Sequence, residues 1–138
     1  MNAYARTSNL AAYQSAAAHG GVAASDPHGL VVMLMDGALE RIATARGCMQ
    51  RGETTEKVRL LNRTAAIIAE LRGSLDMSAG GQIAANLSAL YEYIANRLLS
   101  ALANNQIEPL DEASKLLGEI RGAWIQIPPQ ARTSKVSP

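Results

Sequence analysis

The chain has 138 residues, which suffices for one domain with a substantial core, and its formal net charge at pH 7 is only +1. This charge excludes the strongly basic surface by which proteins hold nucleic acid or anionic membranes. Hydrophobic residues reach 48%, although Phe is absent and aromatic residues make up only 4%. A core of Leu, Ile, Ala and Met favours packed helices, because strands prefer aromatic and β-branched side chains.

Cys48 is the single cysteine, so the chain has no intramolecular disulfide and a reducing compartment is the simpler interpretation. Although Arg46 and Arg51 are near in sequence, we expect Cys48 to be a small buried apolar residue rather than a reactive thiol. The first residues lack the charged start and apolar run of a signal peptide, and no segment approaches the ~18 apolar residues of a membrane span. We therefore expect a cytoplasmic protein without membrane insertion.

Residues 1–25 are rich in Ala, Ser, Gly and Asn, and their bulky apolar side chains are those of Tyr4, Leu10 and Tyr13. This composition predicts a flexible N-terminal arm or a short cap helix, because little apolar surface is available to fix it. We expect a helical bundle over residues 26–128 and a disordered tail over residues 129–138.

The first helix is predicted from Pro27 to about Gln50. Asp26 can accept hydrogen bonds from the free N–H groups of the first turn, and Pro27 suits a position whose own N–H is not needed. Gly52 provides a left-handed stop. The inward row has a spacing of three and four residues: Val31, Leu34, Ala38, Ile42, Ala45 and Met49.

The second helix is predicted to begin at Thr54 as its N-cap, with an ion pair from Glu53 to Lys57 across the junction. It carries two neighbouring rows of mostly apolar residues. One consists of Val58, Leu61, Ala65, Ile68, Arg72 and Leu75, and the other of Leu60, Thr64, Ile67 and Leu71. Because a helix of a small bundle needs only one buried stripe, the second row predicts a surface kept for another helix.

The third helix is predicted from about Gln82 to Ala103, after a break at residues 78–81, and it also has two apolar rows. They are Ile83, Leu87, Leu90, Ile94 and Leu98, and beside them Ala84, Leu87, Tyr91, Ala95 and Leu98. The fourth helix is predicted to begin near Pro109 and to stop before Pro128, with Asp111 paired to Lys115. Its row is Leu110, Ala113, Leu117, Ile120, Trp124 and Ile127.

Four helices of similar length with short connections predict an all-α fold, an antiparallel up-down-up-down four-helix bundle with a mobile N-terminal arm. The sequence contains neither the Glu-x-x-His pairs of a bundle metal site nor a nucleotide-binding loop. His19 lies in the Gly-rich arm and His28 in the first turn of a helix, and we expect both to be solvated. We expect no catalytic residue, no metal and no cofactor.

Several segments, taken in their order along the chain, resemble the FliS family of flagellin export chaperones. They are Tyr-Gln at residues 13–14, Ser-Asp-Pro-His-Gly-Leu at 25–30, Leu-Met-Asp-Gly-Ala-Leu at 34–39, Asn-Leu-Ser-Ala-Leu-Tyr-Glu-Tyr at 86–93, and Trp124. Met35 departs from the Tyr that the family usually places before Asp-Gly.

This resemblance implies a cytoplasmic helical bundle, without enzymatic activity or cofactor, that binds the C-terminal region of newly made flagellin. In the family the client is kept from premature polymerisation and brought to the export gate of the flagellar type III apparatus. An unassembled flagellin terminus carries amphipathic helices, and a bundle with outward grooves can cover their apolar stripes. The implied partners are therefore flagellin and a component of the export gate.

We expect the flagellin-binding grooves along the second faces of the second and third helices. The candidate residues are Leu60, Ile67, Leu71, Leu90, Tyr91, Ile94 and Leu98. Each of them could instead fill a wide core. Tyr91 and Tyr93 are the best candidates for a partly exposed edge, because a ring can pack while its hydroxyl stays in water.

The resemblance also implies that the N-terminal arm can lie over the bundle and move when flagellin arrives. Tyr4, Leu10 and Tyr13 are the residues that such a lid requires, and a plain disordered leader is the alternative. A competing function is a self-associating structural bundle without a flagellin client, in which the surplus apolar faces pair between copies, as in a homodimer.

Overall fold

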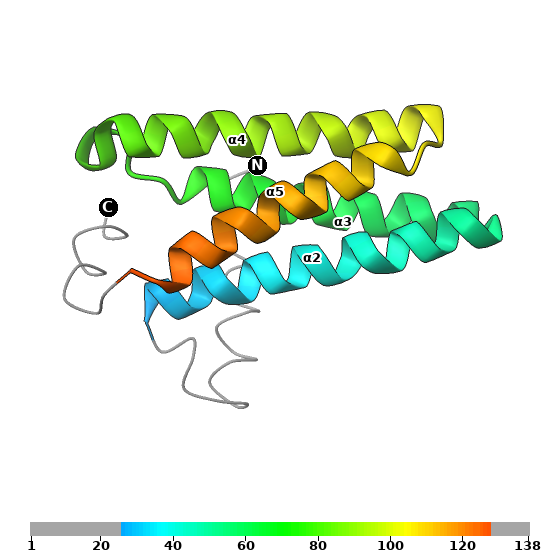
Figure 1. Cartoon of the computed structure of the whole chain (residues 1–138), viewed down its shortest axis with the longest axis horizontal. Coiled ribbons are helices and arrows are strands. Elements are labelled where there is room, and N and C mark those ends of the chain that lie inside the picture. Colours follow the sequence, from blue (N-terminus) through cyan, green and yellow to red (C-terminus); the bar gives the residue numbers. More distant parts are fainter. Residues whose placement is uncertain (1–25, 128–138) are drawn as a thin grey trace.

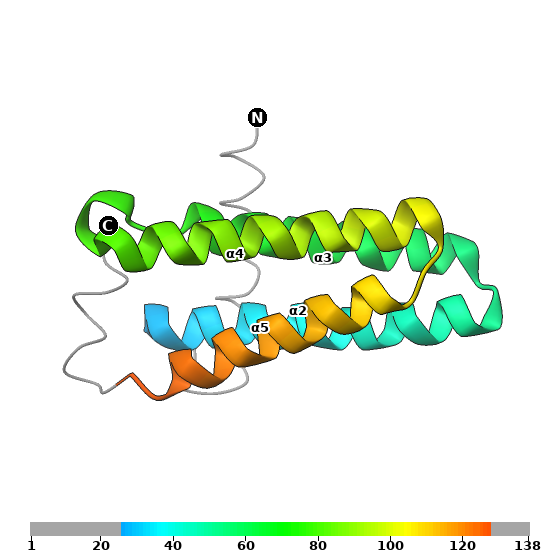
Figure 2. The same cartoon turned by 45° about the horizontal axis from the view of Figure 1, so that its top comes forward.

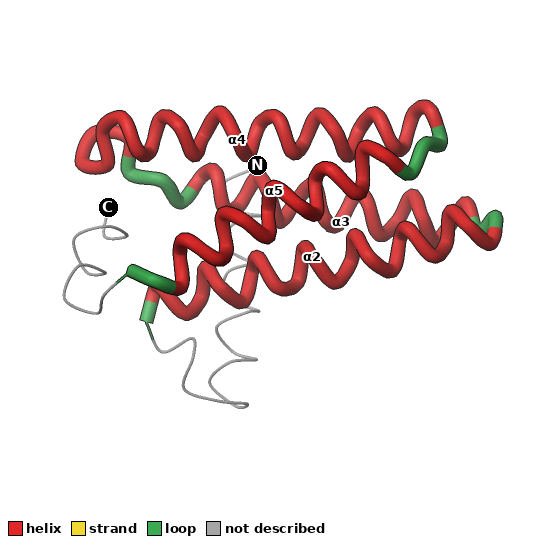
Figure 3. Tube along the Cα trace, in the orientation of Figure 1, coloured by secondary structure: helices red, strands yellow, loops and turns green. Residues whose placement is uncertain are grey.

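The structure is a computed structural model and describes residues 26–127. Within this range the chain forms four helices, α2 (Pro27–Arg51), α3 (Thr54–Gly73), α4 (Met77–Asn104) and α5 (Glu108–Ile125). Short loops join them, and no strand occurs among these residues (Figure 3). The prediction of an all-α four-helix bundle is confirmed. The expected arm and the expected tail lie outside the described residues.

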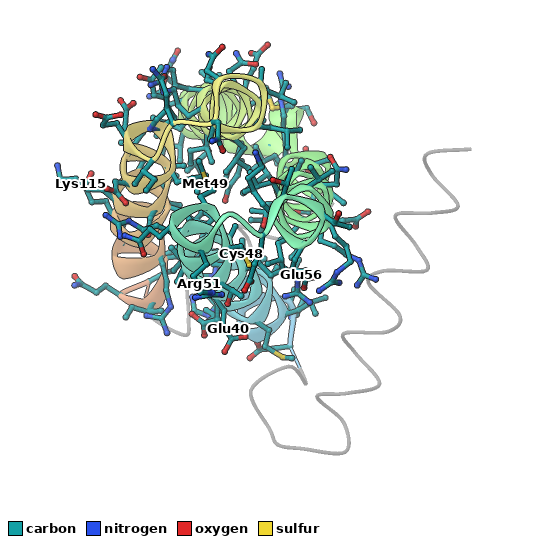
Figure 4. All side chains as sticks on the ribbon, turned by 90° about the vertical axis from the view of Figure 1, so that its right-hand side faces the viewer. Glu40, Cys48, Met49, Arg51, Glu56 and Lys115 are labelled. Carbon is teal, nitrogen blue, oxygen red and sulfur yellow. The ribbon has the colours of Figure 1, made fainter. Side chains whose placement is uncertain are left out.

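The four helices form a closed ring of packed neighbours. α2 packs on α3, α3 on α4 and α4 on α5, and α5 packs back on α2. α5 is inclined, since it begins beside the end of α4 and ends beside the beginning of α2 (Figures 1 and 2). In the view along the bundle, Met49 points toward the interior and Lys115 away from it (Figure 4).

All four helices contribute Leu, Ile or Met side chains to one continuous core. Its largest fully buried members include Leu34, Met35, Ile42, Leu61, Ile68, Leu71, Ile94, Leu98, Leu110 and Leu117. Cys48 is buried at the same core, as predicted, and burial raises the pKa of its thiol. The thiol is therefore kept in its protonated, less nucleophilic form.

The predicted ends of α2 are confirmed by their capping groups. The Asp26 carboxylate accepts a hydrogen bond of 2.7 Å from the Gly29 N–H, and Pro27 occupies the first turn. Gly52 has a φ of 74° and donates its N–H to the last carbonyls of the helix. A left-handed residue at this position favours glycine, because a Cβ would be strained there.

The starts of α3 and α4 differ from the prediction. Thr54 is the first residue of α3 and Glu53 precedes it without a side-chain cap. α4 begins at Met77 rather than near Gln82, because Asp76 caps an additional turn by accepting from the Ala79 N–H. This turn meets the main helix at Gly81, whose φ of 56° and ψ of −132° interrupt the helical backbone.

The two predicted local ion pairs are replaced by other contacts. Glu53 pairs with Arg51, and the Lys57 ammonium donates instead to the Asn105 side chain at 3.1 Å. The Asp111 carboxylate binds Arg46 of α2. Lys115 pairs with Glu119. Exposed pairs four residues apart contribute little, so partners on a neighbouring helix can replace them.

His28 is also placed differently from the prediction, since it is buried rather than solvated. Its ring packs between the start of α2 and the end of α5, where it contacts Trp124.

Among residues 26–127, no helix combines the length and the hydrophobicity that a membrane span requires.

Candidate functional site

The structure places six of the seven candidate flagellin-binding residues inside the bundle. Of these seven, only Leu90 is exposed, at 38%. The others are buried: Leu60, Ile67, Leu71, Tyr91, Ile94 and Leu98. The prediction that these six form an outward face is therefore wrong. The α3 row of Leu60, Thr64, Ile67 and Leu71 is buried, and so are Leu61 and Ile68 of the neighbouring row, because this helix has two packing neighbours, α2 on one flank and α4 on the other.

The two tyrosines of α4 have opposite surroundings. Tyr93 is 42% exposed, as expected of an edge residue, whereas Tyr91 is only 3% exposed. The expectation of a partly exposed ring is therefore wrong for Tyr91. The lid residues Tyr4, Leu10 and Tyr13 lie outside the described range, and so does His19.

An apolar row on the first half of α4 remains uncovered, and we call it the α4 stripe. It consists of Ile83, Leu87 and Leu90, which share one face of the helix. Ile83 is 63% exposed and Leu87 is half-buried against the core. Ile94 and Leu98 continue the same row, but they are buried. The stripe is thus the open part of a row that the bundle covers farther along.

The inclination of α5 explains where this cover ends. Near its beginning, α5 is joined to α4 by Glu112, which accepts a hydrogen bond of 2.6 Å from the Tyr93 hydroxyl. The Arg97 Nε lies 2.9 Å from the same carboxylate as an ion pair, without hydrogen-bond geometry. Farther along, polar side chains of α5 bind to α2, through Arg121 to Asp36 and through Trp124 to His28. α5 therefore leaves α4 before it reaches the α4 stripe (Figure 2).

A second surface feature is a groove of about 530 Å³ between α3 and α4, which we call the α3–α4 groove. Four small residues contribute to its wall, namely Ala65, Ala69, Gly73 and Ala95, and the remaining lining is Ile68, Arg72, Tyr91, Glu92 and Asn96. It is a depression open to solvent rather than an enclosed cavity. Small side chains at this position leave room beside the two helix backbones.

One end of the α3–α4 groove carries a polar bridge between the helices. The Arg72 guanidinium donates to the Ser88 hydroxyl at 2.8 Å and lies 3.5 Å from a carboxylate oxygen of Glu92. Beside this bridge, burial raises the pKa of Tyr91 to about 12.

Sequence reasoning missed part of both surfaces. The excess apolar row on α4 was recognisable, but Ile83 and Leu87 were not selected from it. The Ala65, Ala69 and Gly73 spacing of four residues was the available signal for a small-residue wall on α3. Within residues 26–127, His, Cys, Asp and Glu side chains form no group of three suited to a metal ion.

Comparison with known proteins agrees with the resemblance. The family described as "Flagellar protein FliS" matches residues 9–131. The "Flagellar secretion chaperone FliSB" of Pseudomonas aeruginosa is 43% identical over 112 residues, which are 81% of this chain and 89% of that protein. The "Flagellar secretion chaperone FliS" of Vibrio cholerae is 38% identical over 122 residues, covering 88% and 90% of the two chains. The protein of the same name from Salmonella typhimurium is 38% identical over 125 residues, covering 90% and 93%. The chain therefore belongs to the FliS family of flagellar secretion chaperones.

Proposed function

We propose that this chaperone binds the C-terminal region of flagellin in the cytoplasm, prevents its premature polymerisation and delivers it to the flagellar export gate. Membership of the FliS family supports a role in flagellar export. The proposed role consists of binding and release and contains no chemical step. The observation that carries the flagellin-binding part is the α4 stripe, because this is the uncovered part of an apolar row that is buried farther along the helix.

The physical basis is recognition of an amphipathic helix by an apolar surface. A flagellin helix can place its own apolar row on Ile83, Leu87 and Leu90, with anchors three and four residues apart. Burying such rows against each other removes apolar area from water on both partners. Ordering a previously disordered client opposes binding, so a single stripe gives limited affinity and a longer contact is needed. The α3–α4 groove offers the second part of that contact.

The seven candidate residues take different parts in this proposal. Leu90 contacts the client directly, and Tyr91 contacts it from the α3–α4 groove. The five remaining residues support these contacts from the core, namely Leu60, Ile67, Leu71, Ile94 and Leu98. Tyr4, Leu10 and Tyr13 form the lid in this proposal. A chain without residues 1–20 should then stay folded and bind flagellin as tightly or more tightly, and loss of binding with an intact fold would contradict the lid.

The test of the client is binding of the full chain to flagellin, measured by calorimetry and by sizing chromatography. Full-length flagellin should form a complex, and flagellin without its C-terminal segment should not. Equal binding to both forms, or binding to neither, contradicts the proposed client. Delivery needs a second experiment, which measures whether flagellin and an export-gate component compete for the chaperone.

The test of the site is the variant Leu90→Asp, with Ile125→Asp as its control. Both side chains are exposed, at 38% and 43%, but Ile125 lies near the end of α5 and belongs neither to the α4 stripe nor to the groove lining. Leu90→Asp should weaken flagellin binding by about tenfold or more, because it places a charge within a desolvated contact. Ile125→Asp should leave the affinity unchanged. Similar losses in both variants would remove the α4 stripe from the site.

The self-associating bundle is the alternative that this experiment also tests. If the α4 stripe pairs between copies, the unmixed chain is a dimer or a larger assembly, and Leu90→Asp converts it to a monomer without any response to flagellin.

A further inference from the structure

The α3–α4 groove and the α4 stripe lie on different flanks of α4. Leu90 belongs to the flank that α5 leaves uncovered, whereas Tyr91 belongs to the flank that faces α3. Neighbouring positions on a helix are about 100° apart, so a single helical segment of the client cannot pack on the α4 stripe and in the α3–α4 groove at once. The groove therefore needs its own explanation.

The wall of the groove can receive a polypeptide closely. Ala65, Ala69 and Gly73 follow one another at intervals of four residues and so share one face of α3, and Ala95 lies on the facing side. Small residues permit the close approach of another backbone. The same groove is lined by Tyr91, whose hydroxyl has no hydrogen-bond partner among residues 26–127.

Tyr91 is 97% removed from solvent, since its exposed fraction is 3%, and it lines the groove. Among the hydrogen bonds of residues 26–127, none involves the Tyr91 hydroxyl. By contrast, Tyr93 two residues later satisfies its hydroxyl with Glu112. The hydroxyl oxygen of Tyr91 is not among the fully enclosed, unpartnered side-chain atoms of residues 26–127, so it keeps a solvent-accessible surface and is available to a ligand in the groove.

The chemistry of the hydroxyl indicates which kind of group the ligand presents. Arg72 and Glu92 beside the groove are paired with each other, so their charges largely cancel. The O–H of Tyr91 has no acceptor among residues 26–127, so an acceptor oxygen on the ligand can use it. A peptide presents such acceptors as main-chain carbonyl or side-chain carboxylate oxygens.

We infer that the Tyr91 hydroxyl donates a hydrogen bond to an acceptor oxygen of a flagellin segment that lies in the α3–α4 groove. This inference rests on the proposed function. It gives Tyr91 a role in specificity for the client in addition to its place in the core. Apolar contact on the α4 stripe supplies affinity, and the Tyr91 hydroxyl discriminates against segments that offer no acceptor at the right position.

The experiment compares Tyr91→Phe with Tyr93→Phe in the full chain, using calorimetry with full-length flagellin. Both variants keep the ring and remove one hydroxyl, but the Tyr93 hydroxyl is bound to α5 outside the groove. Tyr91→Phe should bind flagellin roughly three- to tenfold more weakly, which is the effect of one lost hydrogen bond. Tyr93→Phe should bind as the unaltered chain does. Unchanged affinity in Tyr91→Phe, or an equal loss in both variants, would overturn the inference.

A second pair of variants tests whether the groove is occupied at all. Ala69→Leu fills the groove, whereas Ala66→Leu adds the same side chain to an exposed position of α3 outside the groove lining. Weaker binding of Ala69→Leu alone supports the inference, and equal binding of both variants contradicts it. If the unaltered chain does not bind flagellin, the proposed function fails together with the inference. If the unaltered chain binds flagellin and the Tyr91→Phe and Ala69→Leu variants bind it with unchanged affinity, the inference alone fails.

Discussion

His28 and Trp124, 96 positions apart in the sequence, are joined by two reciprocal hydrogen bonds. The His28 Nε2 donates to the Trp124 carbonyl at 2.7 Å, and the Trp124 Nε1 donates to the His28 carbonyl at 3.1 Å. Their rings are stacked, with centroids 5.0 Å apart and an angle of 11° between the planes. Since a carbonyl can only accept, this geometry places a proton on Nε2 of His28. The pair fixes the end of α5 to the beginning of α2.

The first prediction concerns this pair. Trp124→Phe keeps an aromatic ring next to His28 but removes the indole N–H, so the unfolding free energy should fall by about 1 kcal/mol. Urea unfolding followed by far-ultraviolet circular dichroism measures the change, because the chain loses its only Trp as a fluorescent reporter. An unchanged midpoint with an unchanged slope would mean that the reciprocal bonds do not stabilise the bundle.

Local chemistry explains why parts of the fold were predictable. Asp26, Pro27 and Gly52 act on the helix that they flank, so the sequence sufficed to locate both ends of α2. The start of α4 was missed because Gly80 and Gly81 indicate a break, whereas the cap that begins the extra turn is Asp76, farther upstream. Ion pairs were missed for a different reason. The spacing of four residues suggested Lys115 as the partner of Asp111. In the structure Arg46 binds Asp111 from the neighbouring helix, and sequence spacing carries no information on that contact.

The candidate site was less predictable than the fold. The sequence identifies a surplus of apolar rows on α3 and α4, but which row stays uncovered depends on the inclination of α5. That inclination follows from contacts between distant residues, of which His28 with Trp124 and Asp36 with Arg121 are examples. Tyr91 was therefore expected at an edge although its ring lies in the core.

The second prediction concerns the ion pair between Asp36 of α2 and Arg121 of α5. Asp36→Arg places two positive charges together and should lower the Tm by a few degrees, since exposed pairs contribute little. The exchanged pair, Asp36→Arg with Arg121→Asp, should recover most of the loss. Thermal unfolding at low and at high salt measures both effects, and salt should reduce the difference by screening. If the exchanged pair is no more stable than Asp36→Arg alone, the two residues are not coupled.

The third prediction concerns alkaline pH. The pKa of Tyr91 is raised from 10.0 to about 12 by burial, so the folded chain retains this proton more strongly than the unfolded chain. The resulting stability is complete below about pH 10 and is lost as the pH rises from 10 toward 12. Two units of pKa correspond to about 2.7 kcal/mol. Tyr91→Phe should lack this contribution to the pH dependence. Urea unfolding of both proteins at about pH 9, 10.5 and 11.5 measures the difference. Parallel pH curves for the two proteins would show that Tyr91 does not titrate in this way.

The last prediction separates backbone conformation from packing at two glycines. An added Cβ at Gly118 or at Gly81 meets no other heavy atom within 4 Å, so neither substitution creates a clash. Gly118 lies within α5 and has no left-handed φ, so Gly118→Ala should raise the unfolding free energy by about 0.4 to 1 kcal/mol by restricting the unfolded chain. Gly81 has a φ of 56° and a ψ of −132°, which an L side chain rarely adopts, so Gly81→Ala should lower it by about 1 to 3 kcal/mol. Urea unfolding followed by circular dichroism measures both, and because the surroundings are equally open, opposite signs isolate the backbone effect. A stabilising Gly81→Ala would mean that the turn at residues 77–80 does not join the main helix through this glycine conformation.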